Sequence, residues 1–268
     1  MQRILITGAA GRVGTAVRPH LGQRYALRSL DLIPVSDAGP GEETIVGDLN
    51  DAAVLRAALD GVDAVVHLAC VHGHALTFEA SLDANYRAVV ALLEATQRSG
   101  VRRFVYASSH HVFGLHRREG FDAHTAPLAP DAYYGLSKAF GELACAMVAH
   151  RYGLRTLVVR IGNADPQVGD DRALRLWVSA RDLAQLFAIG IEHPEVRYDV
   201  VYGVSICPQP LFDDAHAARL GYAPRDRAEA HLAPGFVPFD AMPERLGREY
   251  VGGAYVPAPL PTHLEEDT

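Results

Sequence analysis

Three residues in the middle of the chain have the types and spacing needed to take a proton from an alcohol. Tyr134 and Lys138 lie four residues apart in a segment of helical pattern, which puts the phenol and the ammonium group on one face. A free tyrosine has a pKa of about 10, and a neighbouring positive charge favours the phenolate, so we expect Lys138 to lower the pKa of Tyr134. Ser109, just past the end of a predicted strand, can hold the reacting oxygen. We therefore predict Ser109, Tyr134 and Lys138 as catalytic residues in general acid–base chemistry.

A glycine-rich turn near the N-terminus indicates a dinucleotide site. Gly8, Gly11 and Gly14 stand in the sequence TGAAGRVG, between an apolar strand and a helix. Glycines let the backbone approach a pyrophosphate, and the helix N-terminus favours its negative charge. Glycine also serves ordinary tight turns, but the strand before and the helix after are the context that this motif requires. A tyrosine and a lysine four residues apart, like Tyr134 and Lys138, also occur by chance in helices. Chance is a poor explanation when the same chain carries this glycine turn as well.

An acidic residue at the end of the second predicted strand indicates which dinucleotide binds. Asp31 lies 17 residues after Gly14. A carboxylate at this point binds the ribose hydroxyls of the adenosine and repels a 2′-phosphate, so we predict NAD rather than NADP. Arg28 lies within the strand and is a weak candidate for a phosphate ligand. Asp48 and Leu49 are placed to hold the adenine edge, although Asp48 can equally cap the helix that follows.

Four histidines follow two predicted strands that neighbour each other. His72 and His74 follow one strand, and His110 and His111 follow the other. A zinc site is conceivable, but no carboxylate or thiolate stands at a convincing spacing, and we predict no metal. We expect His111, His72 and His110 near the substrate, although a packed or solvated imidazole is the simpler interpretation for His110 and His74.

An arginine is the candidate for holding a negatively charged group. Arg172 precedes Trp177 in a predicted loop, and it is either an anion clamp or one more surface arginine. Trp177 is expected to be a packing anchor. Cys70 and Cys145 are expected to behave as small buried hydrophobes.

The elements that must position these residues alternate between strand and helix. Asn50 is expected to cap the second helix. The stretch 63–69 is an uninterrupted apolar strand, as a parallel sheet covered on both faces requires. Such alternation with short connections predicts an α/β fold with a doubly wound parallel sheet, the Rossmann arrangement. The predicted strands are 3–7, 26–31, 43–46, 63–69, 103–107 and 155–160, and the predicted helices are 11–21, 51–59, 78–99 and 134–151.

After residue 160 the pattern loosens. We expect a loop over 162–171, and then a helix at 180–192 and a strand at 198–204. The tail from Cys207 is rich in Pro and Gly, with one further helix near 213–220. We predict an NAD-binding Rossmann domain over 1–161 and a small substrate-side lobe over 162–268, of which 180–204 returns to the Rossmann sheet.

Composition excludes several classes of protein. The 268 residues include 25 Lys+Arg against 32 Asp+Glu, a formal net charge of −7, which argues against a nucleic-acid partner. Hydrophobic residues at 49% exclude intrinsic disorder as the main state. No apolar run approaches the roughly 20 residues of a membrane helix, and the first residues lack a signal-peptide layout. Three cysteines without C-x-x-C spacing predict a cytoplasmic protein without disulfides.

The chain resembles the extended short-chain dehydrogenase/reductase family over nearly its whole length. Within that family it is similar to the sugar C1 dehydrogenases, typified by uronate dehydrogenase and by archaeal-type NAD-dependent glucose-6-phosphate dehydrogenases. The shared motifs are Ala107-Ser108-Ser109-x-His111, Tyr134-Gly135-Leu136-Ser137-Lys138 with Gly141-Glu142, Val159-Arg160-Ile161-Gly162, Arg172, Trp177-x-Ser179, Val201-Tyr202-Gly203-x-Ser205 and Leu220-Gly221-Tyr222.

The resemblance implies an NAD-dependent oxidation of an aldose at C1 to the lactone, with a sugar that bears an anionic group. It implies that Ser109, His111, Tyr134 and Arg172 contact the sugar, and that Lys138 serves both cofactor binding and catalysis. Our full predicted NAD set is Gly8, Ala10, Gly11, Arg12, Val13, Gly14, Asp31, Leu32, Asp48, Leu49, Leu68, Ala69, Cys70, Asn85, Ala107, Tyr134, Lys138 and Ile161. The predicted substrate set is His72, Ser109, His110, His111, Tyr134, Asn163 and Arg172.

Two departures from the family pattern put the exact sugar in doubt. His110 stands where the uronate enzymes have Asn. The loop from Ala69 to His74 differs in sequence and is one residue longer before Asn85. A nucleotide-sugar epimerase or reductase of the same superfamily and a non-catalytic NAD-binding regulator are the alternatives. About 64 residues after Val204 leave little room for a nucleoside-diphosphate pocket, and a regulator needs no Ser-Tyr-Lys set. Apolar stripes on the helices at 78–99 and 134–151 predict a homodimer.

Overall fold

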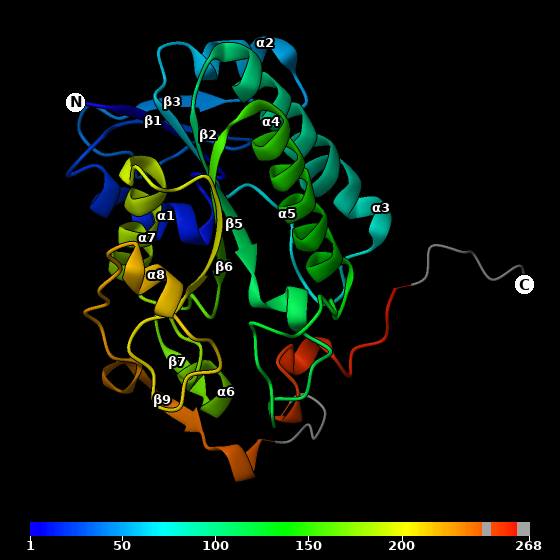
Figure 1. The fold of residues 1–268 in the computed structure, drawn as a ribbon. Coiled ribbons are helices and arrows are strands. Elements are labelled where there is room, and N and C mark those ends of the chain that lie inside the picture. Colours follow the sequence, from blue (N-terminus) through cyan, green and yellow to red (C-terminus); the bar gives the residue numbers. More distant parts are fainter. Residues whose placement is uncertain (243–247, 262–268) are drawn as a thin grey trace, which may run out of the picture.

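The computed structural model describes residues 1–242 and 248–261, and its centre is one parallel sheet of seven strands (Figure 1). The strand order is β3-β2-β1-β4-β5-β6-β8, and every neighbouring pair is parallel. This order reverses direction between β1 and β4, which opens a crevice at the carboxyl ends of these two strands. The predicted doubly wound fold is confirmed. The strands are β1 (Arg3–Thr7), β2 (Ala26–Asp31), β3 (Glu43–Val46), β4 (Ala64–His67), β5 (Arg103–Ser109), β6 (Arg155–Ile161) and β8 (Tyr198–Gly203).

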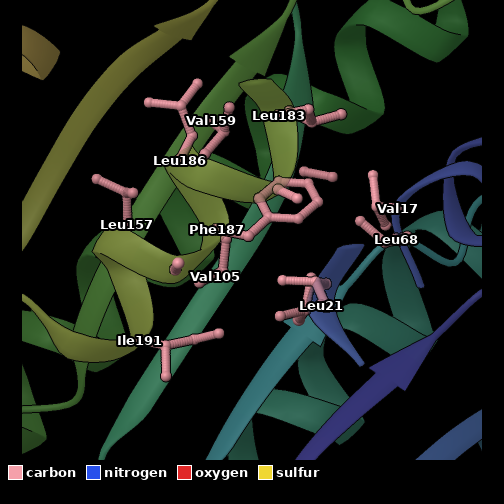
Figure 2. Close-up of a cluster of buried hydrophobic side chains, with 14 of the residues drawn as sticks. Val17, Leu21, Leu68, Val105, Leu157, Val159, Leu183, Leu186, Phe187 and Ile191 are labelled. Atoms are coloured by element: carbon pink, nitrogen blue, oxygen red, sulfur yellow. The ribbon is translucent and has the colours of Figure 1, made fainter. Parts of the chain in front are cut away.

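Helices cover both faces of the sheet, because each face presents an unbroken apolar surface. One face carries α1 (Arg12–Leu21), α7 (Ala180–Glu192) and α8 (Ala215–Arg219), and the other carries α2 (Ala52–Leu59), α4 (Ala88–Ser99) and α5 (Tyr133–Tyr152) (Figure 1). On the first face, aliphatic and aromatic side chains of α1 and α7 meet those of the central strands (Figure 2). The labelled members of this cluster are Val17, Leu21, Leu68, Val105, Leu157, Val159, Leu183, Leu186, Phe187 and Ile191.

The predicted helix at 78–99 forms, but it is not regular. A short α3 (Phe78–Ser81) passes into a π-helical turn, Leu82–Arg87, and then into α4. The π-turn holds the buried Asn85, and α4 ends at Gly100, whose φ of +81° suits glycine. Single π-turns inside helices are frequent at functional sites, and this one faces the loop that follows β4.

Three local predictions are wrong. Asp51, rather than Asn50, caps α2: its carboxylate accepts hydrogen bonds from the backbone N–H groups of Ala53 and Val54, so the helix begins at Ala52. β5 runs two residues beyond the predicted end at 107, so Ser109 is its last residue and does not lie past it; its backbone is in register with Ile161 of β6. The expected loop over 162–171 contains β7 (Val168–Asp170) and the first residue of α6 (Asp171–Leu174).

The C-terminal part builds a wall beyond the carboxyl ends of the strands. β7 pairs with β9 (Leu232–Val237) in a separate two-stranded sheet. The segment after residue 248 lies against the loop that follows β5, where Val251 N–H donates to the carbonyl of His116 at 3.0 Å and Gly252 N–H to that of Gly114 at 2.9 Å. The division into domains at residue 161 stays a prediction. α7 and β8, which lie within the segment 180–204 expected to return to the Rossmann sheet, belong to the layers of the main sheet. Within the described ranges, no helix has the length and apolarity to cross a membrane.

Candidate active site

Two adjoining cavities lie at the carboxyl ends of the central strands. The Asp31 cavity, of about 220 Å³, is bordered by the ends of β1, β2 and β4, and the Tyr134 cavity, of about 380 Å³, by those of β1, β5 and β6. Both are lined by Gly8, Gly11, Leu68 and Cys70, so the glycine turn lies where they meet. An extended ligand can therefore run from one cavity to the other past the start of α1.

The glycine turn fits a dinucleotide pyrophosphate for reasons of space. A Cβ on Gly8, whose φ is +72°, would lie 2.5 Å from the backbone nitrogen of Ala69, and one on Gly14 would lie 2.5 Å from the carbonyl oxygen of Gly8. A side chain at Gly8 would collide with the backbone after β4, and one at Gly14 would push α1 away from the turn. Gly11 is the N-cap of α1, whose first turn carries no acidic side chain and leaves its N–H groups to an anion.

Asp31 closes the far end of the first cavity. Its Oδ2 accepts a hydrogen bond from Ala10 N–H at 2.9 Å and its Oδ1 one from Ile33 N–H at 3.3 Å. A carboxylate has further acceptor positions, which leaves room for hydroxyl donors. Leu32 is 64% exposed and Ile33 59% exposed beside it, as expected for side chains that cover a flat base. Arg28 points elsewhere and donates to backbone carbonyls of α2 and its C-terminus.

Asp48 lies on the same cavity but does not cap the next helix. Its Oδ1 accepts from the backbone and side-chain nitrogens of Asn50 at 2.8 and 3.1 Å. The capping alternative for Asp48 is wrong, because Asp51 fills that position.

Four residues of the predicted NAD set do not line either cavity in this structure. Asn85 holds the loop after β4: its side chain accepts from Val71 N–H and donates to the Val71 carbonyl, both at 2.8 Å. Lys138 is buried and donates from Nζ to the carbonyl of Ala107 at 2.7 Å. Ile161 is buried at the end of β6. Ala107 is the fourth residue outside the cavities. For every member of the set, a role in binding NAD stays a prediction. The other members of the set line one cavity or both: Gly8, Ala10, Gly11, Arg12, Val13, Gly14, Asp31, Leu32, Asp48, Leu49, Leu68, Ala69, Cys70 and Tyr134.

The phenol of Tyr134 faces the second cavity from the first turn of α5. Burial raises its pKa well above the ordinary value of 10, while a side-chain hydrogen bond with Ser109 and the charge of Arg12 act in the opposite direction. Lys138 Nζ lies 5.7 Å from the centroid of the Tyr134 ring. Burial of the phenol thus outweighs the charge of Arg12, and the lowering of the Tyr134 pKa expected from Lys138 stays a prediction.

His110 and His111 follow β5 directly and are both buried. His110 Nδ1 lies 3.2 Å from the carbonyl of Ile161, and the two imidazole centroids are 4.1 Å apart. Burial and the charge of Arg172 hold the pKa of each histidine well below its usual value. Both are therefore neutral at pH 7, and His110 is a packed imidazole that also lines the cavity.

The histidines of the other loop lie further out. The His72 ring centroid is 6.0 Å from that of Tyr134, and burial together with the charge of Arg12 lowers its pKa. His74 packs edge-on against Tyr255.

Arg172 lies at the far wall of the Tyr134 cavity, in α6 rather than in the predicted loop. One guanidinium nitrogen, Nη1, donates to the carbonyl of Val251 and to His110 Nε2, each at 3.0 Å. The guanidinium has five N–H donors, so others remain for an anion. Asn163 lines the same wall and donates to Asp165 at 3.0 Å, and Trp177 is 2% exposed, as a packing anchor should be.

Several cavity residues could not be recognised in the sequence. Tyr255 stands in the aperiodic tail, and Asp165 has no motif around it, yet it pairs with Arg12 across the second cavity. Asp131 lies behind His111; an aspartate three residues before Tyr134 reads as an ordinary helix-start residue. The remaining unpredicted lining residues are Leu30, Ile33, Gly47, Val71, Ala84, Ala88, Gly162 and Ala164.

Metal binding finds no support among the side chains placed by the structure, because no group of three or more His, Cys, Asp and Glu residues in the described ranges could hold an ion. The four histidines are instead tied to backbone, Arg172, Asp131 or aromatic rings.

Known proteins are similar over nearly the whole chain. Uronate dehydrogenase of Pseudomonas putida is 40% identical over 264 residues, which cover 96% of this chain and 96% of the relative. NAD-dependent glucose-6-phosphate dehydrogenase of Haloferax volcanii is 33% identical over 249 residues, covering 85% of this chain and 94% of the relative. The crystal structure of uronate dehydrogenase from Agrobacterium tumefaciens superimposes with a TM-score of 0.87 at 34% identity, over 97% of this chain and 98% of that chain.

The NAD dependent epimerase/dehydratase family matches residues 4–164, which hold every strand and turn that borders the Asp31 cavity. This agrees with the predicted resemblance and with NAD as the cofactor, and both predictions are confirmed. The chain belongs to the NAD dependent epimerase/dehydratase family.

Proposed function

We propose that this protein is an NAD-dependent dehydrogenase that oxidises the C1 hydroxyl of a uronate to the lactone. One observation carries the proposal: the phenol of Tyr134, a proton acceptor, and the guanidinium of Arg172, which has donors to spare, line the same cavity beside the glycine turn. Tyr134 and Arg172 both line the 380 Å³ cavity, whose size suits one sugar ring beside the end of a cofactor. The similarity to uronate dehydrogenases over the full chain supports the same conclusion.

The chain's own residues supply the proton chemistry. When bound, NAD supplies a positively charged ring that accepts the hydride from C1. Ser109 orients the C1 hydroxyl, and the phenolate oxygen of Tyr134 takes its proton as the C1–H bond breaks and the C1–O bond becomes double. The charge of Arg12 acts against the burial that raises the pKa of Tyr134, and Lys138 Nζ, 5.7 Å from the ring centroid, adds a second positive charge near the phenol; both favour the ionised form that this step requires.

Arg172 decides the substrate class. A guanidinium matches a carboxylate with two parallel hydrogen bonds, and the burial of Arg172 makes an anion a favourable partner for its charge. A sugar phosphate is the second candidate, because one relative acts on glucose 6-phosphate; a sulfosugar is the third. His110 narrows the cavity beside Arg172 and is the residue to test for the choice among them.

Two further alternatives make different demands on the site. A nucleotide-sugar epimerase returns the hydride to its substrate and accumulates no NADH. A non-catalytic NAD-binding regulator binds the cofactor without turnover, so Tyr134→Phe would leave its function unchanged. Continuous NADH formation that depends on Tyr134 separates the proposed function from both.

The assembly and location also belong to the proposal. Three side chains on one face of α5 are exposed apolar groups: Leu136 at 42%, Leu143 at 65% and Met147 at 58%. We assign this face to a two-fold homodimer interface. All three cysteines have free thiols, which suits the reducing cytoplasm.

The direct test is NADH formation from NAD with a panel of sugars. The panel contains a uronate, its neutral parent aldose, a sugar 6-phosphate and a 6-sulfosugar. The proposal expects the uronate to give the highest kcat/KM. If a sugar phosphate gave the highest kcat/KM, the proposed reaction would stand and the proposed substrate would change from a uronate to a sugar phosphate.

A further inference from the structure

A buried carboxylate is in contact with one of the cavity histidines. Asp131 Oδ2 lies 2.6 Å from His111 Nδ1, and the side chains are 0% and 8% exposed. Asp131 precedes α5, three residues before Tyr134, while His111 follows β5. The pair therefore joins the two elements that carry the phenol and the serine.

The space around this carboxylate is kept open by glycines from three segments. A Cβ on Gly114 would lie 1.9 Å from Asp131 Oδ2, and one on Gly252 would lie 2.1 Å from the same atom. A Cβ on Gly135 would lie 3.0 Å from Oδ1. A glycine thus lies against the Asp131 carboxylate in each of three segments: the loop after β5, the first turn of α5 and the C-terminal tail. A larger residue at these places would collide with the carboxylate.

The pair lies among mostly neutral groups. The His111 ring centroid is 4.1 Å from those of His110 and Tyr255 and 5.6 Å from that of Tyr134. The permanent charge that acts on both members is the guanidinium of Arg172, and His72 acts on His111. Burial raises the pKa of Asp131 to about 7, although the N–H groups of Asp131 and Ala132 act against it.

Proton counting fixes what the other ring nitrogen does. With one proton on the imidazole and Asp131 ionised, Nδ1–H donates to Asp131 and Nε2 has only a lone pair. A second proton makes either an imidazolium beside a carboxylate or a carboxylic acid that donates to Nδ1. In both forms Nε2 carries a hydrogen. Among the described residues, the hydrogen bonds of the His111 ring are made by Nδ1 and none by Nε2, and His111 lines the Tyr134 cavity.

We propose that Asp131 is a positioning residue that holds His111 with Nε2 toward the sugar, and that the proton shared by the pair decides whether Nε2 accepts or donates a hydrogen bond there. This inference rests on the proposed function, and it specifies how a histidine of the same cavity makes a hydrogen bond to the substrate. A sugar hydroxyl suits the accepting form, and a carbonyl or carboxylate oxygen suits the donating form. Asp131 itself does not touch the substrate; it acts through His111.

Kinetics of a double-mutant cycle test the positioning role. Asp131→Asn should lower kcat/KM for the best sugar by about 10- to 100-fold, the cost of a charge-assisted hydrogen bond. In the His111→Gln background the same change should cost less than about 3-fold, because the residue it acts through is gone. Asp60→Asn, at an exposed aspartate, is the matched control and should change nothing. Equal losses in both backgrounds would make Asp131 a merely structural residue and overturn the proposal.

NMR of the full chain labelled with ¹⁵N-histidine tests the proton itself and needs no substrate. The signals of His111 are those that His111→Gln removes. Above pH 8 we expect Nδ1 protonated and Nε2 unprotonated, with Nε2 gaining its proton near pH 7; Asp131→Asn should abolish this pattern. A His111 that titrates alike with and without Asp131 would overturn the shared-proton proposal. Absence of turnover with every sugar would instead refute the proposed function, and the NMR result would still decide whether the pair shares its proton.

Discussion

Arg172 Nη1 donates a hydrogen bond to the carbonyl oxygen of Val251 at 3.0 Å, and this contact joins the substrate wall to the C-terminal tail. The tail thereby orients the guanidinium before any anion arrives. An arginine that is already ordered loses less side-chain entropy on binding, so more of its interaction with an anion appears as affinity.

Arg172→Ala should raise KM for a uronate by about 10- to 100-fold and change kcat far less, because ground state and transition state share a contact remote from C1. A neutral aldose should be affected much less. The measurement is steady-state kinetics with both sugars. Arg175→Ala, in the same segment but paired with Asp171, is the control and should leave both KM values unchanged. Equal losses on charged and neutral sugars would remove Arg172 from the anion site.

Tyr134→Phe should lower kcat by at least about 10²-fold, because the ring is kept and the proton acceptor is lost. NAD binding, measured by calorimetry, should be retained. Tyr133→Phe is the control: Tyr133 packs against Phe78 and does not line either cavity, so kcat should stay within about 2-fold of the unmodified protein. A Tyr134→Phe protein with normal turnover would refute the assigned chemistry.

Asp31→Ser should narrow the preference for NAD over NADP by roughly tenfold or more, because a carboxylate close to a 2′-phosphate is repelled in a partly desolvated cavity. NAD affinity should fall as well, since Ala10 N–H loses its acceptor. The ratio of kcat/KM for the two cofactors measures the effect. Asp60→Ser, at an exposed aspartate outside both cavities, should leave that ratio unchanged. Comparable use of both cofactors by the unmodified protein would contradict the role of Asp31.

Leu143→Glu should convert a dimer into a monomer, because it places a charge at the centre of the exposed apolar face of α5. Light scattering on the eluting protein measures the mass. Leu232→Glu, at an exposed leucine of β9 in the separate two-stranded sheet, should keep the dimer. A 29.0 kDa particle for the unmodified chain at micromolar concentration would show that this face is not an interface between copies.

The sheet and the glycine turn could be predicted from the sequence because their signals are local. Apolar runs ending in glycine or aspartate mark β1 and β2, and Asp31 follows from its distance to the turn. The N-cap of α2 lies one residue after the predicted Asn50, because Asn50 and Asp51 both suit an N-cap and only the backbone geometry separates them.

The far wall of the site could not be predicted because its contacts are long-range. Tyr255, Val251 and Gly252 come from an aperiodic tail, and their places follow from backbone pairing with the loop after β5. The rise in the Tyr134 pKa could not be predicted for a related reason: the lysine four residues on is visible in the sequence, whereas the burial that dominates the shift depends on the assembled cavity.

The most direct test of the central claim is the ratio of kcat/KM for a uronate and for its neutral parent aldose, measured as NADH formation by the unmodified protein. If Tyr134 oxidises C1 while Arg172 holds an anion, the uronate should be favoured by roughly 100-fold or more, the worth of a buried charge-assisted contact. Equal values for the two sugars, or no NADH from either, would contradict the account.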